Sequence, residues 1–213
     1  MTDFSSLGLN PQLCRACDAL GYTTPSPIQE KAIPLMLQGH DVLGIAQTGT
    51  GKTAAYALPV LMRCKYAQGK NPRALILAPT RELVMQIHEV MVGLAVETDL
   101  RMLALYGGLG PKTQIQALED GVDILVSTPG RFLELYRKDT IVVKDLKILI
   151  LDEADKMMDM GFMPQIREIL EKIPYKKRQN GLFSATFPEK VENLSHEFLE
   201  FPHKVEITRQ ATP

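Results

Sequence analysis

The amino-acid sequence predicts an α/β fold built around a mostly parallel sheet. Seven short apolar runs alternate with longer segments of helical character, as in a parallel α/β domain. The run at 148–151 is aliphatic at every position, as expected for a strand that is buried on both faces. Six of the runs lead directly into Gly, Thr, Ser, Arg or acidic residues, at the sheet edge where ligands bind in such folds. The predicted strands are DVLGIA (41–46), RALILAP (73–79), RMLALYG (101–107), DILVSTP (123–129), LKILILD (146–152), NGLFSAT (180–186) and KVEIT (204–208).

The composition is that of a soluble globular domain. Hydrophobic residues make up 45% of the chain and charged residues 23%, which gives no reason to predict disorder. No apolar run approaches the roughly 18 residues of a membrane helix, and the first ten residues lack the features of a signal peptide. We therefore expect a cytoplasmic protein without a membrane partner, with residues 1–213 forming a single domain. Because the net charge is −1, any affinity for nucleic acid must come from local basic groups.

The first predicted element is a helix near the N-terminus. Apolar residues recur at helical spacing between Leu9 and Leu20. Cys14 and Cys17 stand at the spacing of a metal or redox pair, but this helical periodicity favours packing as their role. The Pro-rich stretch TTPSP (23–27) then predicts a turn before the first strand.

The segment after the first strand has the pattern of a phosphate-binding loop. It reads AQTGTGKT (46–53) and leads into an apolar segment of helical periodicity. Gly49 and Gly51 allow backbone N–H groups to turn toward a polyphosphate, and the helix N-terminus adds its positive end. Lys52 is placed to reach the outer phosphates, and Thr53 to offer its hydroxyl to Mg²⁺.

Two features of this loop depart from simple patterns. Ala46 stands where the strict phosphate-loop pattern has Gly, which is the position with the least chemistry. Gly49-x-Gly51-x-x-Ala54 also matches a dinucleotide fingerprint, and that would indicate a redox enzyme. Such folds need an acid about 20 residues further on for the ribose, yet no Asp or Glu stands between positions 41 and 82. The sequence therefore favours a nucleoside triphosphate over a dinucleotide.

The aliphatic run at 148–151 is followed at once by acidic residues. Unpaired carboxylates at the end of a buried strand are costly, so they need a partner. With a triphosphate on Lys52, Asp152 can hold its Mg²⁺, and Glu153 can orient the attacking water. Helix capping would explain one of these acids, but it explains Asp152, Glu153 and Asp155 together poorly.

With both segments in place, the chain resembles the first RecA-like domain of the DEAD-box ATP-dependent RNA helicases. The resemblance extends from about Phe4 to about Thr208 and implies a three-layer domain with helices on both faces of the sheet. KMMDMGF (156–162) is similar to the bacterial RhlE-type branch. The matching motifs are GYTTPSPIQ (21–29), AQTGTGKT (46–53), PTREL (79–83), GG (107–108), TPGR (128–131), DEAD (152–155) and SAT (184–186).

The resemblance implies an adenine-nucleotide site. Gln29 would read the adenine edge, since a side-chain amide both donates and accepts, and Phe4 would stack on the base. The implied catalytic residues are Lys52, Asp152 and Glu153, with Thr53 and Asp152 as Mg²⁺ ligands. The implied ATP-binding residues are Phe4, Tyr22, Gln29, Ala46, Thr48, Gly49, Thr50, Gly51, Lys52 and Thr53.

It also implies an RNA site and a connection between the two sites. The implied contacts are to the RNA backbone and carry little sequence information, so binding should follow the sugar-phosphate chain of single-stranded RNA. Ser184 and Thr186 would link nucleotide and RNA through hydrogen bonds toward Asp155. The implied RNA-binding residues are Pro79, Thr80, Arg81, Gly108, Thr128, Gly130 and Arg131.

Helicases of this family need a second RecA-like domain that closes over ATP and RNA, and 213 residues leave no room for it. We expect the intact protein to be an RNA-stimulated ATPase that opens short duplexes locally. We expect this chain to be monomeric and to bind adenine nucleotide with little turnover. An alternative is an ATP-dependent RNA clamp that assembles partners without unwinding. A DNA-directed relative is disfavoured by Gln29 and Asp155, which resemble the RNA-acting branch.

Overall fold

The computed structural model describes residues 3–108 and 110–208, and within them the chain forms a seven-stranded sheet. Every strand pair is parallel, and the strand order is β3-β4-β2-β5-β6-β1-β7. All seven predicted runs form strands, so the prediction of an α/β fold with a mostly parallel sheet is confirmed. The strands are β1 (Val42–Ile45), β2 (Ala74–Leu77), β3 (Met102–Leu105), β4 (Ile124–Ser127), β5 (Ile148–Asp152), β6 (Gln179–Ser184) and β7 (His203–Glu206).

Both faces of the sheet are covered, which makes a three-layer domain. In β5, Ile148 and Ile150 pack into one buried apolar cluster, whereas Leu149 and Leu151 pack into the other. Successive side chains of a strand point to opposite faces, so a strand with both faces covered must be apolar at every position. This explains the uninterrupted aliphatic run that the sequence places before its acids.

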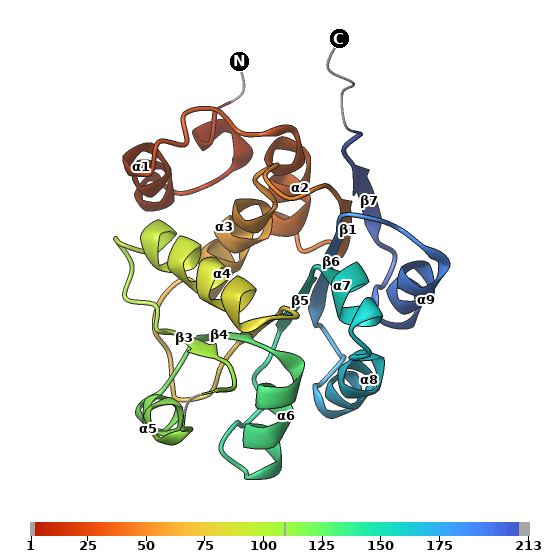
Figure 1. The fold of residues 1–213 in the computed structure, drawn as a ribbon. Coiled ribbons are helices and arrows are strands. Elements are labelled where there is room, and N and C mark those ends of the chain that lie inside the picture. The colour runs from red at the N-terminus through yellow and green to blue at the C-terminus, as the bar shows by residue number, and fades with distance from the viewer. Residues whose placement is uncertain (1–2, 109, 209–213) are drawn as a thin grey trace.

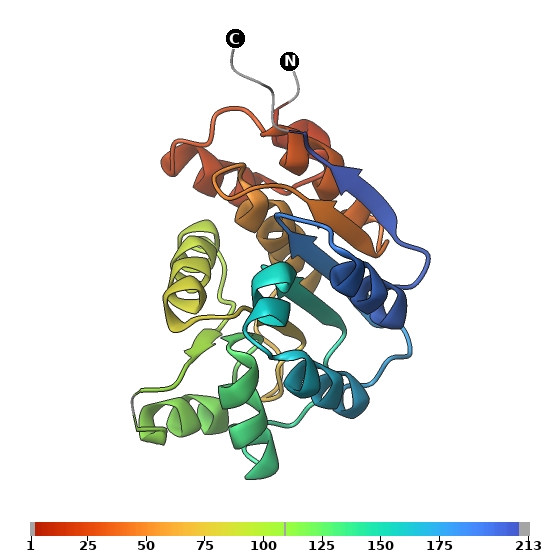
Figure 2. The same ribbon diagram turned by 45° about the vertical axis from the view of Figure 1, so that its right-hand side comes forward.

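The helices divide between the two faces by their order in the chain. Those of the N-terminal half, α1 to α4, contribute to the first cluster, and α5 to α9 contribute to the second. Figures 1 and 2 show the two groups on either side of the sheet. The helices are η1 (Ser5–Leu7), α1 (Pro11–Ala19), α2 (Pro27–Leu37), α3 (Lys52–Cys64), α4 (Arg81–Leu94), α5 (Lys112–Asp120), α6 (Pro129–Arg137), α7 (Ala154–Asp159), α8 (Met163–Lys172) and α9 (Glu189–Phe198).

The N-terminal CxxC pair lies on α1, as the helical spacing predicts. Cys17 is fully buried against the core, and burial raises the pKa of its thiol to about 12. A buried thiol with so high a pKa is almost entirely protonated at neutral pH and is a poor nucleophile. Within the described ranges, no three residues of the types His, Cys, Asp and Glu come together as a metal site. Packing is therefore the role of this pair.

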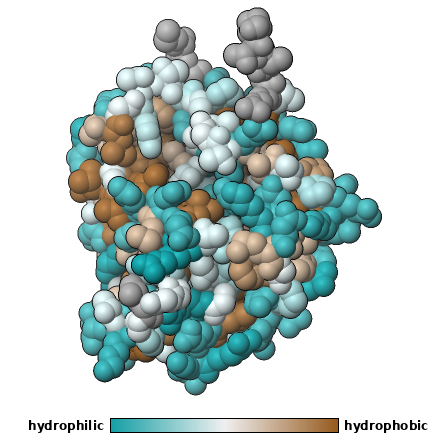
Figure 3. All heavy atoms as spheres, viewed as in Figure 1, coloured by the Kyte–Doolittle hydropathy of each residue, from teal (hydrophilic) through white to brown (hydrophobic). Residues whose placement is uncertain are grey.

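The surface seen in Figure 3 is largely hydrophilic, with some apolar side chains over α1 and α4. Leu20, Val92 and Val96 are 44%, 47% and 67% exposed, respectively. In the part of the chain that the structure describes, no helix combines the length and the hydropathy that crossing a membrane requires.

Candidate nucleotide and RNA site

The strand order divides the predicted site residues into two groups along one edge of the sheet. β1, β6 and β5 are neighbours, and their carboxyl ends lead into the phosphate-binding loop, SAT and DEAD. β2, β4 and β3 are also neighbours, and they lead into PTREL, TPGR and GG. Because β5 lies between β2 and β6, DEAD stands where the two groups meet (Figure 1). The predicted nucleotide and RNA residues therefore share one edge but lie on its two halves.

The loop between β1 and α3 is shaped by two glycines with left-handed backbone. Gly49 has φ 87° and Gly51 has φ 82°, a region that costs other residues about 1–2 kcal/mol. Gly51 is the N-cap of α3, and a Cβ at this position would collide with the side-chain amide of Gln29. Glycine is therefore required at position 51 by both conformation and space. The loop leaves the N-terminus of α3 open toward a cavity, which suits an anion.

Lys52 and Asp152 form the buried charged centre of the site. Lys52 Nζ lies 3.2 Å from Asp152 Oδ1, and their side chains are 7% and 1% exposed. The two groups form an ion pair without a hydrogen bond between them. The buried ammonium consequently has no hydrogen-bond acceptor among the described residues. Buried N–H groups are nearly always paired, so a ligand with phosphate oxygens fits this position.

Tyr56, on the next turn of α3, also contacts Asp152. Its hydroxyl donates a 2.7 Å hydrogen bond to Asp152 Oδ2. Burial, together with the negative charge of Asp152, raises the pKa of Tyr56 well above its ordinary value, so the hydroxyl stays protonated. Tyr56 is not among the site residues predicted from the sequence. Its position four residues after Lys52, on the same helix face, is the signal that could have found it.

Glu153 follows Asp152 with strained backbone. It has φ 54°, in the left-handed region, and its N–H donates a 2.8 Å hydrogen bond to Asp152 Oδ1. Its carboxylate is 9% exposed and pairs with Lys156 Nζ at 2.7 Å. The sharp turn of the chain after β5 therefore sends the two successive carboxylates in different directions. This separation is what the distinct roles predicted for Asp152 and Glu153 require.

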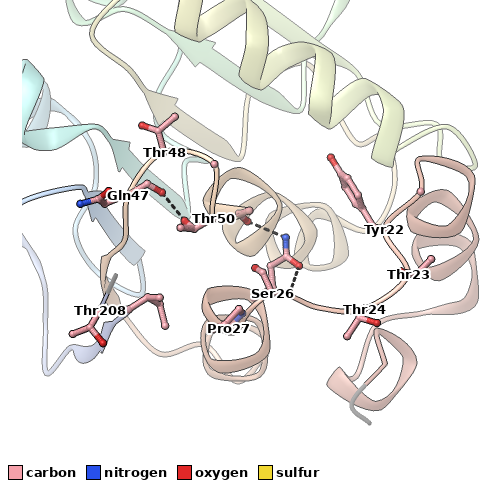
Figure 4. A pocket seen from close by; sticks show the side chains of 14 residues that line it. Tyr22, Thr23, Thr24, Ser26, Pro27, Gln47, Thr48, Thr50 and Thr208 are labelled. Atoms are coloured by element: carbon pink, nitrogen blue, oxygen red, sulfur yellow. Dashed lines mark hydrogen bonds between the residues drawn. The ribbon is translucent and has the colours of Figure 1, made fainter. Parts of the chain in front are cut away.

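A cavity of about 710 Å³ adjoins the phosphate-binding loop. It is lined by the segment around Tyr22 and Gln29 on one side and by residues 47–51 on the other, as Figure 4 shows. A smaller cavity of about 250 Å³ shares Tyr22 and Gln29 with it and reaches Lys52 and Asp152. The arrangement accommodates a flat polar group in the larger space and a chain of phosphates in the smaller one.

Gln29 ties this segment to the loop. Its amide nitrogen donates a 3.0 Å hydrogen bond to the Gly51 carbonyl, and its amide oxygen accepts a 2.9 Å hydrogen bond from the Ser26 backbone N–H. A side-chain amide can make four hydrogen bonds, and these two leave one donor and one acceptor position for a ligand. Gln29 can therefore hold the loop and still recognise a base.

Phe4 does not line either cavity. It is 4% exposed and packs into the first apolar cluster, at the N-cap of η1. Tyr22, by contrast, is half-buried and borders both cavities. A stacking contact between Phe4 and a base stays a prediction, and it would require the ring to leave this packing.

Asp155, on the first turn of α7, is hydrogen-bonded to the SAT segment. The Thr186 hydroxyl donates to Asp155 Oδ2 at 2.8 Å, and the Asp155 N–H donates to Ser184 Oγ at 3.2 Å. The Ala46 N–H donates to the Ser184 carbonyl at 3.0 Å. One end of SAT thus contacts the phosphate-binding loop, and its side chains contact DEAD. These are the contacts that the predicted coupling residues would need.

On the other half of the edge, two arginines converge on Tyr106. The Arg81 guanidinium lies 5.0 Å from the centre of the Tyr106 ring and is exposed. Arg131 is 7% exposed; its Nε donates to the Tyr106 carbonyl at 3.1 Å, and its Nη1 pairs with Glu134 at 3.2 Å. A phosphate would therefore meet Arg81 freely but would compete with Glu134 for Arg131. A direct phosphate contact by Arg131 stays a prediction.

The other predicted RNA residues lie around the same loops. The Thr80 hydroxyl accepts from the Leu83 N–H at 3.2 Å and caps α4, while Pro79 before it is buried. Gly108 has φ 90°, and a Cβ there would come within 3.3 Å of Arg81 Nη1. Thr128 is the N-cap of α6, and Gly130 is exposed on its first turn. Two helix N-termini and an exposed guanidinium therefore gather here, which suits an anionic chain.

Comparison with known proteins identifies close similarities over almost the whole chain. The family model described as DEAD/DEAH box helicase matches residues 26–194. The chain is 44% identical to the ATP-dependent RNA helicase DeaD of Buchnera aphidicola subsp. Schizaphis graminum, over 98% of this chain and 35% of that protein. It is 43% identical to DeaD of Escherichia coli K12, over 99% and 33% of the two chains. It is 42% identical to the ATP-dependent RNA helicase CshA of Listeria monocytogenes, over 97% and 39%.

A solved structure is equally similar in fold. The crystal structure of a DEAD box protein from the hyperthermophile Methanococcus jannaschii matches with a TM-score of 0.91 and 34% identity. The match covers 97% of this chain and 56% of that one. This chain spans about a third of the length of the curated relatives that it matches, at 35%, 33% and 39%.

Proposed function

The chain belongs to the DEAD/DEAH box helicase family, and from this premise we propose that it is the ATP- and RNA-binding part of an ATP-dependent RNA helicase. The observation that carries the proposal is the buried Lys52 ammonium, which has an ion-pair partner in Asp152 but no hydrogen-bond acceptor among the described residues. A nucleotide phosphate supplies the missing acceptors. The names of the relatives, ATP-dependent RNA helicases DeaD and CshA, support the same activity.

Each part of the site has a task in ATP binding and hydrolysis. Gln29 holds the loop through the Gly51 carbonyl and reads the adenine with its remaining donor and acceptor. Lys52 and the N-terminus of α3 bind the phosphates. Thr53 and Asp152 would hold Mg²⁺, which when bound neutralises developing phosphate charge. Glu153 orients the attacking water, and its pairing with Lys156 at 2.7 Å keeps its carboxylate in place.

RNA would lie along the other half of the edge, over the N-termini of α4 and α6. Arg81 is an exposed cation of this surface and Arg131 lies buried beside it, while the other groups are hydroxyls and backbone N–H groups. Such groups contact phosphate and sugar rather than base edges, so binding should depend little on RNA sequence. Asp155, Ser184 and Thr186 would transmit the state of one half to the other through their hydrogen bonds.

Because the relatives are about three times as long as this chain, we infer that a second RecA-like domain works with it in the intact protein. That domain would supply arginines to the developing phosphate charge, a contribution of roughly 10³ to 10⁵ in rate where an arginine finger has been measured in other NTPases. The intact protein would open short duplexes locally, and this chain alone would turn over little ATP. A clamp that assembles partners without unwinding would use the same residues and is the second candidate function.

Nucleotide binding by the 213-residue chain tests the proposal. Isothermal titration with ADP and GDP in the presence of Mg²⁺ should give tighter binding of ADP. Lys52→Ala should weaken ADP binding at least about tenfold, since it removes a charge-assisted contact. The exposed Lys144 provides a matched control, and Lys144→Ala should bind like the wild type. Equal affinity for ADP and GDP would refute the adenine site, and a Lys52→Ala variant with wild-type affinity would refute the phosphate site.

RNA-stimulated hydrolysis separates the role of this chain from that of the intact protein. The isolated chain should hydrolyse ATP slowly, with or without a single-stranded RNA. A rate near that of a full-length DeaD protein would show that no second domain is needed. Duplex unwinding by the full-length protein then distinguishes the helicase from the clamp.

A further inference from the structure

Both oxygens of the Asp152 carboxylate are held by protein groups. Oδ1 accepts a 2.8 Å hydrogen bond from the Glu153 N–H and lies 3.2 Å from Lys52 Nζ. Oδ2 accepts a 2.7 Å hydrogen bond from the Tyr56 hydroxyl. The side chain is 1% exposed, so bulk water cannot replace a lost donor freely. Tyr56 is therefore the group that determines how the second oxygen is oriented.

We propose that Tyr56 is a positioning residue of the metal-binding end of the site. Its hydroxyl holds the Asp152 carboxylate in the orientation that Mg²⁺ with a nucleotide requires. Tyr56 follows Thr53 by three residues on α3, so the phenol contacts one of the two residues to which the proposed function assigns the metal and lies one turn from the other. The proposal rests on that function and adds to it a residue that touches neither nucleotide nor metal.

The position of the Tyr56 ring is itself determined by the sheet. Tyr56 is fully buried, and its ring packs on that of Phe183 with the centroids 5.1 Å apart and the planes tilted by 49°. Phe183 on β6 lies over Gly44 on β1, where a Cβ would come within 2.6 Å of the ring. Because Tyr56 is fully buried and Phe183 is itself packed against Gly44, the phenol has little freedom to move. Its hydroxyl is thus a rigid donor for the carboxylate at the end of the neighbouring strand β5.

A hydroxyl in this place could instead serve stability alone, by satisfying a buried carboxylate. The two roles differ in what they do to ligand binding. A group that only stabilises the fold affects ADP binding equally with and without Mg²⁺. A group that orients a metal ligand affects binding only when the metal is present, and removal of such outer partners typically lowers metal affinity 10- to 100-fold.

The test compares ADP affinity in Mg²⁺ and in EDTA for the wild-type chain and for Tyr56→Phe, which removes only the hydroxyl. Tyr56→Phe should reduce the ratio of ADP affinity in Mg²⁺ to ADP affinity in EDTA about tenfold. The affinity in EDTA should stay within about twofold of the wild-type value. Tyr136→Phe is the matched control, because Tyr136 stacks on Phe132 with a centroid distance of 6.4 Å, away from the site. It should keep the wild-type ratio.

Introducing Tyr56→Phe into an Asp152→Asn variant tests whether Tyr56 acts through Asp152. If Tyr56→Phe alone folds poorly, because the buried Asp152 carboxylate has lost its hydrogen-bond donor, the Asp152→Asn substitution removes that buried charge. In that background, Tyr56→Phe should change the ratio less than about twofold, because the carboxylate is already lost. Three results would each overturn the proposal. They are a further drop of the ratio when Tyr56→Phe is added to Asp152→Asn, a wild-type ratio in Tyr56→Phe alone, and an equal loss of ADP affinity with and without Mg²⁺ in Tyr56→Phe. A wild-type chain indifferent to Mg²⁺ would overturn the metal assignment, whereas one that binds no ADP would overturn the proposed function itself.

Discussion

Replacing Gln29 by Ala should both destabilise the fold and weaken adenine recognition. Gln29 is 6% exposed and joins two segments that are far apart in the chain. Its amide donates to the Gly51 carbonyl at 3.0 Å and accepts from the Ser26 N–H at 2.9 Å. The first bond closes the phosphate-binding loop, and the second caps α2. Alanine removes both.

The size of the effect follows from these two hydrogen bonds. A typical hydrogen bond contributes about 0.5–1.5 kcal/mol net, so two of them give about 2 kcal/mol. The Gly51 carbonyl also accepts from the Ala55 N–H at 3.2 Å, which keeps it paired in the variant and limits the loss. In a domain of this size, a loss of about 2 kcal/mol lowers Tm by about 4–8 °C.

Calorimetric unfolding and ADP titration measure the two consequences on the same sample. The control is Gln116→Ala, because Gln116 is exposed and its amide donates a 3.0 Å hydrogen bond to Asp120 on the surface of α5. Gln116→Ala should change the free energy of unfolding by less than about 0.5 kcal/mol. In Gln29→Ala, the preference for ADP over GDP should disappear as well.

The two readouts can refute different parts of the reasoning. If Gln29→Ala unfolds within about 0.5 kcal/mol of the wild type, the hydrogen bonds do not hold the loop. If the variant loses stability but still prefers ADP to GDP, Gln29 holds the loop without reading the base. Only the loss of both supports the dual role.

Three further predictions concern other parts of the chain. Burial alone would raise the pKa of Asp123, but hydrogen bonds from two arginines and two backbone N–H groups lower it from 3.8 to about 2. The ionised carboxylate therefore contributes about 2 kcal/mol to the free energy of unfolding at neutral pH, and this contribution should disappear as the pH falls from about 4 to about 2. Acid unfolding of Asp123→Asn should therefore be less steep between pH 4 and 2, and an unchanged pH dependence would contradict this account. Gly44→Ala should lower the free energy of unfolding, measured with urea, by about 1–3 kcal/mol, because the added Cβ comes within 2.6 Å of the buried Phe183 ring. An unchanged free energy of unfolding would show that the ring can shift. Arg81→Ala should weaken the binding of oligo-U and oligo-A equally, measured by fluorescence anisotropy, and should lower the slope of RNA affinity against salt concentration by about 1. Arg137→Ala is the control, because Arg137 is paired with Glu168, and it should leave both quantities unchanged. A loss confined to one RNA sequence would contradict recognition of the RNA backbone.

The strands and the phosphate-binding loop could be predicted from the sequence because their signals are local. A parallel strand with both faces covered must be apolar throughout, and 148–151 satisfies this without reference to any other segment. The loop pattern follows from the needs of a polyphosphate, and Gly49 and Gly51 have the positive φ values that such a loop uses. The acids after β5 are predictable as site residues in the same way, since carboxylates at a strand end require a partner.

The tertiary structure alone decided which side chains meet. Tyr56 and Asp152 are 96 residues apart, and they touch because α3 follows β1 and packs on the sheet beside β6 and β5. The same holds for Phe4, which the packing of the N-terminal helices buries, and for Arg131, which the fold of the β3 loop turns toward the Tyr106 carbonyl. Such contacts depend on the strand order and on helix packing, which are properties of the whole chain. The local pattern therefore determined what chemistry the chain carries, and the order of its strands determined which residues support it.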